Sequence, residues 1–243
     1  MALPKIDSPI YSVKLPLSQK EIMFRPFLVK EQKNLLMALE ADDKETIERN
    51  IKQILHNCTI SEKIDINKLP VVDVEYYFIN LRSKSVGEIV ENTYICNNEP
   101  NNDGNRCGNK MQINIDLNTI QVDNINLDDC NIQLTDKISI KLKYPEFSIV
   151  EKLAESENSV DVAFKIIVDS IENIFDGEQY YYANESTPQE LMEFVESLNQ
   201  DQFSKIEKFF DKIPKIKKDL EIKCSKCGYD HSITVEGLEN FFG

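Results

Sequence analysis

One pattern, C-G-x-x-x-x-I-x-[IV]-[DE], occurs twice in the chain, as Cys107-Gly-Asn-Lys-Met-Gln-Ile-Asn-Ile-Asp116 and as Cys227-Gly-Tyr-Asp-His-Ser-Ile-Thr-Val-Glu236. A further cysteine precedes each copy, at the end of Thr93-Tyr-Ile-Cys96 and of Leu220-Glu-Ile-Lys-Cys224. Apolar residues alternate before each first cysteine and after each second one, which is the period of half-buried strands. The glycine beside the second cysteine permits a tight turn. Each stretch is therefore predicted to form a strand, a cysteine turn and a second strand.

Four thiolates presented by two such hairpins predict a closed, tetrahedral, structural zinc site. The predicted ligands are Cys96, Cys107, Cys224 and Cys227. The second pair has the usual C-x-x-C spacing, whereas ten residues separate the first pair. A flexible polar loop can be inserted between two ligands without moving them, because closure entropy rises slowly with loop length. The alternatives are unbound thiols or a redox pair. By strand alternation, His231 shares the apolar side of Ile233 and Val235. It is either a substitute ligand in a Cys3His site or a histidine that is hydrogen-bonded or exposed.

The chain has 243 residues, of which 41% are hydrophobic and 29% are charged, as in an ordinary globular protein of one large or two small domains. Its net charge of −14 disfavours a zinc-ribbon nucleic-acid binder, because binding to phosphates needs clustered lysine and arginine. The one basic cluster is interpreted as a solvated helix end; it comprises Lys212, Lys215, Lys217 and Lys218.

No run of about 18 apolar residues is present, so no membrane span is expected. The first residues also lack the basic start and apolar core of a signal peptide. We therefore expect a cytosolic protein, in which cysteine pairs bind metal more often than they form disulfides. Cys58 follows an amphipathic segment and is predicted to be a small core residue, while no role is assigned to Cys130.

The rest of the chain alternates between strand patterns and helical patterns. A β-hairpin is predicted over 10–25, followed by helices over 29–39, around 47–55 with Asp42 or Asp43 as its cap, and over 71–81. Further strands are predicted over 111–117, 132–134 and 138–142, and further helices over 146–153, 160–175, 191–198 and 201–213. Tyr180-Tyr-Tyr182 is a short strand or an aromatic patch, and Thr187-Pro-Gln-Glu190 is a capped helix start.

These elements predict an α+β fold, with helical N- and C-terminal parts around a β-rich middle, closed by a split zinc-ribbon-like pair of cysteine hairpins. Four parts are expected. Residues 1–87 hold the N-terminal β-hairpin and helices, 88–145 the β-rich middle with the first cysteine hairpin, 146–218 a helical part, and 219–243 the second cysteine hairpin, which packs back on the middle.

No catalytic residues are predicted. The chain has two histidines and seven glycines, and it lacks glycine-rich phosphate loops and the H-E-x-x-H, G-x-S-x-G and EF-hand patterns. Carboxylate pairs such as Asp128/Asp129 and Glu155/Glu157 fall in polar turns, where a solvated surface is the default. His56 is interpreted as a surface or capping residue. We therefore expect a protein that is not an enzyme.

Several motifs resemble the baseplate hub family of T-even-type contractile-tailed bacteriophages. They are Pro9-Ile-Tyr, Arg25-Pro-Phe-Leu-Val-Lys-Glu31, Asn80-Leu-Arg-Ser-Lys-Ser-Val-Gly-Glu88 and the Cys96…Cys107-Gly108 hairpin. The resemblance covers most of the chain and implies a role in building the central hub of the tail baseplate. It implies other hub or tail proteins as partners, with the tape-measure protein as one candidate, and a location in the host cytoplasm during assembly and in the virion tail baseplate. A transient assembly chaperone absent from the mature virion is the alternative.

Two segments are candidate contact sites for such partners. Arg82, Ser83, Lys84 and Ser85 lead directly into the first cysteine hairpin, and they form either a partner contact or a helix end with a glycine stop. The terminal apolar residues, Leu238, Phe241 and Phe242, are predicted to pack back onto this chain, with docking on another chain as the alternative.

Overall fold

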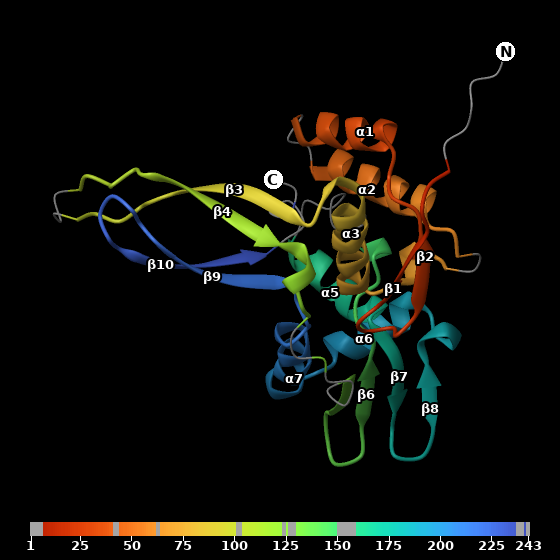
Figure 1. The fold of residues 1–243 in the computed structure, drawn as a ribbon. Coiled ribbons are helices and arrows are strands. Elements are labelled where there is room, and N and C mark those ends of the chain that lie inside the picture. The colour runs from red at the N-terminus through yellow and green to blue at the C-terminus, as the bar shows by residue number, and fades with distance from the viewer. Residues whose placement is uncertain are drawn as a thin grey trace.

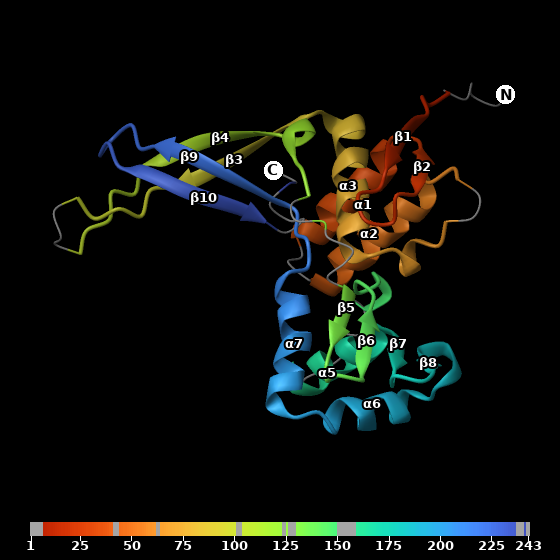
Figure 2. The ribbon, with the colours of Figure 1, turned by 90° about the horizontal axis from the view of Figure 1, so that it is seen from below.

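The computed structural model describes residues 7–40, 44–61, 64–100, 104–122, 125, 130–149, 159–236 and 241. Figures 1 and 2 show an N-terminal group of strands and helices, a second group of strands and helices beside it, and two long hairpins that project together away from both. The fold is therefore a mixture of helices and small antiparallel sheets, as expected for the α+β class.

The N-terminal group begins with an antiparallel hairpin, β1 (Tyr11–Lys14) and β2 (Glu21–Phe24). It continues with α1 (Val29–Glu40), α2 (Lys44–Cys58), the short 3-10 helix η1 (Ile66–Lys68) and α3 (Val71–Val86). One apolar core joins these elements; its most buried members include Leu15, Ile22, Phe24, Leu55, Cys58, Leu69 and Tyr77. The predicted hairpin, the three helices and the core position of Cys58 are confirmed, whereas the predicted cap at Asp42 or Asp43 lies outside the described residues.

Two buried carboxylates tie the hairpin and the helices together. Asp73 of α3 is fully buried and accepts hydrogen bonds of 2.8 Å from the N–H groups of Leu17 and Ser18 in the β1–β2 turn. Glu31, in the first turn of α1, pairs with the Arg25 guanidinium at 2.9 Å. Because buried carboxylates are costly without such partners, both contacts fix where the hairpin sits.

Glu31→Gln is expected to lower the free energy of unfolding by about 2 kcal/mol at neutral pH, since it removes a charge-assisted bond inside the fold. Burial alone raises the pKa of Glu31, but hydrogen bonds from Arg25 and from the N–H of Leu28 outweigh it, so the pKa lies below its ordinary value of 4.5. The carboxylate therefore contributes stability that is present above pH 4.5 and is lost as the pH falls through the folded-state pKa.

Urea denaturation of wild type, Glu31→Gln and the exposed control Glu21→Gln at neutral and acid pH measures this contribution. The Glu31→Gln deficit should shrink in acid, while the control stays close to wild type. A deficit that is the same at both pH values contradicts the assignment.

The second group is a four-stranded antiparallel sheet of order β5-β6-β7-β8, covered by three helices. The strands are β5 (Asn131–Gln133), β6 (Ser139–Leu142), β7 (Ile171–Phe175) and β8 (Tyr180–Tyr182), with the 3-10 helix η4 (Ala183–Glu185) after β8. The helices are α5 (Ser159–Asp169), α6 (Pro188–Glu196) and α7 (Gln200–Asp211). The predicted start of α6 is confirmed, because Thr187 and Glu190 form a reciprocal capping box. Of the predicted helix over 146–153, only residues 146–149 are described.

The predicted helix over 160–175 is wrong in its second half, where the chain forms β7. Leu142 of β6 faces Ile171, and Lys141 faces Asn173, so Glu172 is an extra residue at a β-bulge. Such a bulge resets the alternation of the strand. Ile171 and Ile174 are consequently both buried in one core although they lie three residues apart, a spacing that reads as helical in the sequence.

The projecting part is formed by two antiparallel hairpins, here called the arm. One hairpin consists of β3 (Ile89–Ile95) and β4 (Lys110–Asp116), followed by the 3-10 helix η2 (Leu117–Thr119); the other consists of β9 (Lys217–Lys223) and β10 (Asp230–Glu236). The hairpins lie side by side in both views (Figures 1 and 2). Their facing side chains belong to one apolar cluster, with members Val90, Tyr94, Ile113, Ile115, Leu220, Ile222, Ile233 and Val235.

The same cluster continues into the base of the arm, where α3 contributes Val72 and Ile79. Phe241 is buried there with 2% exposure, so the predicted packing of the C-terminus onto this chain is confirmed for Phe241; Leu238 and Phe242 lie outside the described residues. Strands β5 and β6 share their core with α5–α7 and not with the arm. The division into 1–87, 88–145, 146–218 and 219–243 stays a prediction.

Candidate metal centre

The two cysteine turns at the tips of the arm hairpins close in the same way. In the first, the N–H of Cys96 donates to the carbonyl of Asn109 at 2.9 Å, and the N–H of Gly108 donates to the carbonyl of Cys96 at 3.0 Å. In the second, the N–H of Cys224 donates to the carbonyl of Tyr229 at 2.8 Å, and the N–H of Gly228 donates to the carbonyl of Cys224 at 2.9 Å. Both glycines have positive φ, 64° and 73°, which favours glycine at these positions. The shared sequence pattern thus corresponds to a shared backbone turn.

The ten residues between Cys96 and Cys107 leave this turn intact. The N–H of Cys107 donates to the carbonyl of Asn98 at 2.8 Å. This hydrogen bond closes the insertion at its base, because it joins a residue just after Cys96 to Cys107 itself. The loop therefore adds length without separating the two sulfurs from the rest of the site.

The four cysteine sulfurs converge, with each Sγ atom within 4.8 Å of the other three. The Sγ atoms of Cys96 and Cys227 are 3.7 Å apart, and those of Cys107 and Cys224 are 3.8 Å apart. Zinc bound by four sulfurs at about 2.3 Å in a tetrahedron places neighbouring sulfurs about 3.8 Å apart. The donor set is therefore the right size and chemistry for one metal ion, and thiolate ligands select soft or borderline metals such as zinc.

Backbone N–H groups and burial act on these thiols in opposite directions. The N–H of Cys227 is the main cause that lowers the pKa of Cys224, and the N–H of Tyr229 is the main cause that lowers the pKa of Cys227. Burial raises the pKa of Cys96, which is fully buried. Four adjacent thiols resist ionising together because like charges repel, and a divalent cation at their centre removes that penalty.

His231 lies directly against this cluster. Its side chain is 6% exposed and points into the arm, as expected from the alternation along β10. The ring makes edge contacts with Tyr94 and Tyr229, at centroid distances of 5.3 and 4.7 Å. Its Nε2 atom is 3.1 Å from the Sγ atom of Cys96. Of the alternatives open in the sequence, the exposed histidine is wrong, and the imidazole lies beside a predicted ligand.

Three further polar residues near the sulfurs were not found from the sequence. The amides of Asn98 and Asn109 point at the sulfurs of Cys227 and Cys224, at 3.6 and 3.5 Å. The ammonium of Lys226 donates to the carbonyl of Cys107 at 3.0 Å. One signal was available, because each asparagine stands two residues after a cysteine of the first hairpin.

The candidate contact residues Arg82, Ser83, Lys84 and Ser85 lie in the last turns of α3. Arg82 and Ser83 are buried, and the Arg82 guanidinium donates to the carbonyl of Gly87 at 2.6 Å. Ser85 accepts a hydrogen bond from the N–H of Phe27 at 3.0 Å, and Lys84, the exposed member, pairs with Glu88 at 2.9 Å. The helix end with a glycine stop is confirmed, since α3 ends at Val86. A partner contact through these side chains stays a prediction, and their internal bonds count against it.

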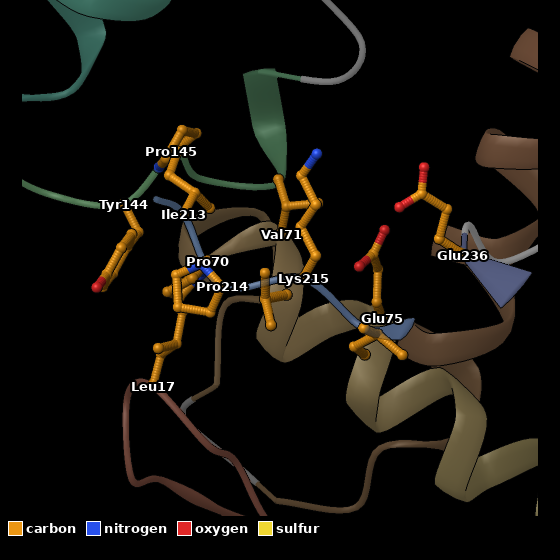
Figure 3. A pocket seen from close by; sticks show the side chains of 12 residues that line it. Leu17, Pro70, Val71, Glu75, Tyr144, Pro145, Ile213, Pro214, Lys215 and Glu236 are labelled. Atoms are coloured by element: carbon orange, nitrogen blue, oxygen red, sulfur yellow. The ribbon is translucent and has the colours of Figure 1, made fainter. Parts of the chain in front are cut away.

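A separate pocket of about 550 Å³ opens at the junction of the N-terminal group, the second group and the base of the arm (Figure 3). Its lining is mostly apolar and includes three prolines, Pro70, Pro145 and Pro214. The charged groups along it are Glu75, Lys215 and Glu236. Among the described lining residues there is no histidine, cysteine, serine or threonine that would form a nucleophile–base pair. The expectation that the chain is not an enzyme stays a prediction.

Within the described part of the chain, no helix combines the length and the apolar character needed to cross a membrane. The baseplate hub assembly protein gp26 of Enterobacteria phage T4 is 26% identical to this chain over 233 residues, which are 96% of this chain and 97% of that protein. No solved structure matches the chain. The family model described as T4 bacteriophage base plate protein matches residues 8–243, and the resemblance seen in the sequence motifs is thereby confirmed. The chain belongs to the T4 bacteriophage base plate protein family.

Proposed function

We propose that this chain acts in the assembly of a phage tail baseplate hub, through contacts with other hub or tail proteins and without catalysing a chemical reaction. The observation that carries this proposal is the similarity to a baseplate hub assembly protein over 96% of the chain. Work in the host cytoplasm during assembly, followed by a place in the virion tail baseplate, is part of the proposal.

The arm is held, in this proposal, by one structural zinc ion bound to Cys96, Cys107, Cys224 and Cys227 in a split zinc ribbon. The sulfur separations of 3.7 and 3.8 Å support it, as do the two matching turns. Zinc in such a site supplies no reaction; it contributes on the order of 10 kcal/mol of apparent folding free energy.

The zinc site lies at the tips of the two arm hairpins, where the folding free energy of the metal would stabilise the arm. Each hairpin of the arm is only two strands wide, and an isolated two-stranded hairpin is marginally stable in water. Their shared apolar cluster joins the hairpins along their length, and the metal joins their tips. The arm thereby becomes a rigid projection, a suitable shape for recognition by another tail protein.

The function is tested by disrupting the gene in the phage that carries it and supplying the wild-type chain or the Cys224→Ser variant in trans. Wild type should restore infectious particles, while the disrupted phage should accumulate tails without complete baseplates. Normal baseplates without the chain contradict the proposal. Mass spectrometry of purified virions then separates a retained hub subunit, present in fixed ratio to other hub proteins, from a transient assembly chaperone, which is absent.

A further inference from the structure

We propose that side chains crossing between the two arm hairpins retain the metal ion, and that His231 is a hydrogen-bond donor to the Cys96 thiolate rather than a ligand. This inference rests on the zinc site proposed above and names the residues that set how tightly the ion is held. His231 is thus a positioning residue, and the asparagines of the first hairpin act with it.

Each hairpin of the arm donates hydrogen bonds to sulfurs of the other hairpin. Asn98 belongs to the first hairpin and its amide points at Cys227 of the second, at 3.6 Å. Asn109 also belongs to the first hairpin, and its amide points at Cys224 of the second, at 3.5 Å. His231 belongs to the second hairpin and contacts Cys96 of the first. Each of these three sulfurs therefore receives its side-chain donor from the opposite hairpin.

The fourth cysteine, Cys107, is contacted from the opposite hairpin at its backbone carbonyl and not at its sulfur. The Lys226 ammonium, from the second hairpin, donates to the carbonyl of Cys107 at 3.0 Å. A divalent ion with four thiolates carries a net charge of −2, which is costly to bury without compensation. The three N–H donors stabilise the thiolates and the Lys226 ammonium adds one positive charge beside them, and all four contacts form only when the hairpins are docked. Metal retention therefore depends on the docked arm, and docking depends on the metal.

The geometry of His231 fits a donor better than a ligand. The Nε2 atom of His231 is 3.1 Å from the Sγ atom of Cys96, so the ring nitrogen contacts that sulfur directly. The group of ligand atoms that all lie within 4.8 Å of one another consists of the four cysteine sulfurs and does not include His231. The four sulfurs also complete the tetrahedron without it. Because a metal-bound thiolate has no proton to give, the proton of this hydrogen bond belongs to Nε2 of His231.

The test compares His231→Phe, His231→Gln and Asn109→Asp with wild type and with the control His56→Phe, which changes an exposed histidine on α2. The protein is purified with its zinc, and the rate of zinc release to a chelator is measured. His231→Phe and Asn109→Asp should release zinc about tenfold faster, because loss of an outer partner weakens metal binding by that order. His231→Gln keeps an N–H donor and should lie closer to wild type, as should His56→Phe.

Replacing zinc with cobalt(II) gives an absorption spectrum that reports hydrogen bonding to the thiolates and does not change when only the packing around the site changes. A hydrogen bond lowers the energy of thiolate electrons, so the thiolate-to-cobalt charge-transfer band should shift to longer wavelength in His231→Phe. The ligand-field bands should remain those of four sulfurs in every variant. If His231→Phe does not fold, Asn109→Asp carries the test through its release rate.

The outcomes separate this inference from the zinc site itself. Wild-type protein without zinc overturns both. Wild type that holds zinc, together with unchanged release rates in His231→Phe and Asn109→Asp, overturns the crossing donors alone. Cobalt bands of a three-sulfur, one-nitrogen site in wild type show that His231 is a ligand and overturn its assignment as a donor.

Discussion

Cys224→Ser and Cys107→Ser are each expected to abolish stoichiometric zinc binding and to lower the melting temperature by about 15 °C. A serine hydroxyl is a poor zinc ligand and leaves only three thiolates at either position, so the ion is bound too weakly to hold the two hairpins together. Both substitutions should have the same effect although they lie in different hairpins, because each hairpin supplies half of one site. Metal analysis and thermal unfolding of each purified variant measure the two effects.

Cys130→Ala is the matched control for this prediction. Cys130 is buried in the second core, away from the cluster, so its loss should cost a small amount of packing and leave the zinc content unchanged. A chelator should lower the melting temperature of wild type and of Cys130→Ala, and should not alter Cys224→Ser further. Loss of zinc without any fall in melting temperature contradicts a structural role for the metal.

Phe241→Ala is expected to lower the free energy of unfolding by about 4 kcal/mol, as for other buried phenylalanines. The ring is 2% exposed and packs in the cluster formed by α3 and the arm hairpins. Its loss leaves a cavity where the arm meets the N-terminal group. Urea denaturation measures the loss, and zinc content should remain at the wild-type level because the sulfurs are at the far end of the arm.

The control for this variant is Tyr180→Ala, which removes an aromatic ring that is 57% exposed on β8. It should change the free energy of unfolding by less than about 1 kcal/mol. If Phe241→Ala is as stable as Tyr180→Ala, the C-terminal residue does not close the base of the arm. A loss of zinc in Phe241→Ala would instead show that the base and the tip of the arm are coupled.

Most of the correct predictions rested on patterns among residues that are neighbours in the sequence. Strand alternation and the repeated C-G turn are properties of neighbouring residues, so both arm hairpins followed from the sequence. The helix start at Thr187 was equally local. The β-bulge at Glu172 was missed because the register of β7 is set by β6, thirty residues earlier in the chain, and no local signal marks it.

The polar contacts of the cysteine sulfurs could not be predicted from the sequence, because they too depend on residues far apart in the chain. Asn98 and Asn109 contact cysteines of the other hairpin, so their role exists only once the two hairpins face each other. The buried position of His231 followed from alternation, whereas its contact with Cys96 did not. The side chains from Arg82 to Ser85 looked available in sequence, but the helix continues through them and turns two of them inward.

Native mass spectrometry of the full chain, expressed and purified without added metal, measures whether one ion joins the two hairpins. The expected mass corresponds to the chain plus one zinc ion with all four cluster cysteines deprotonated, and acid treatment should remove the zinc and unfold the arm. A chain that carries no metal, and whose melting temperature is the same with and without a chelator, would contradict the account.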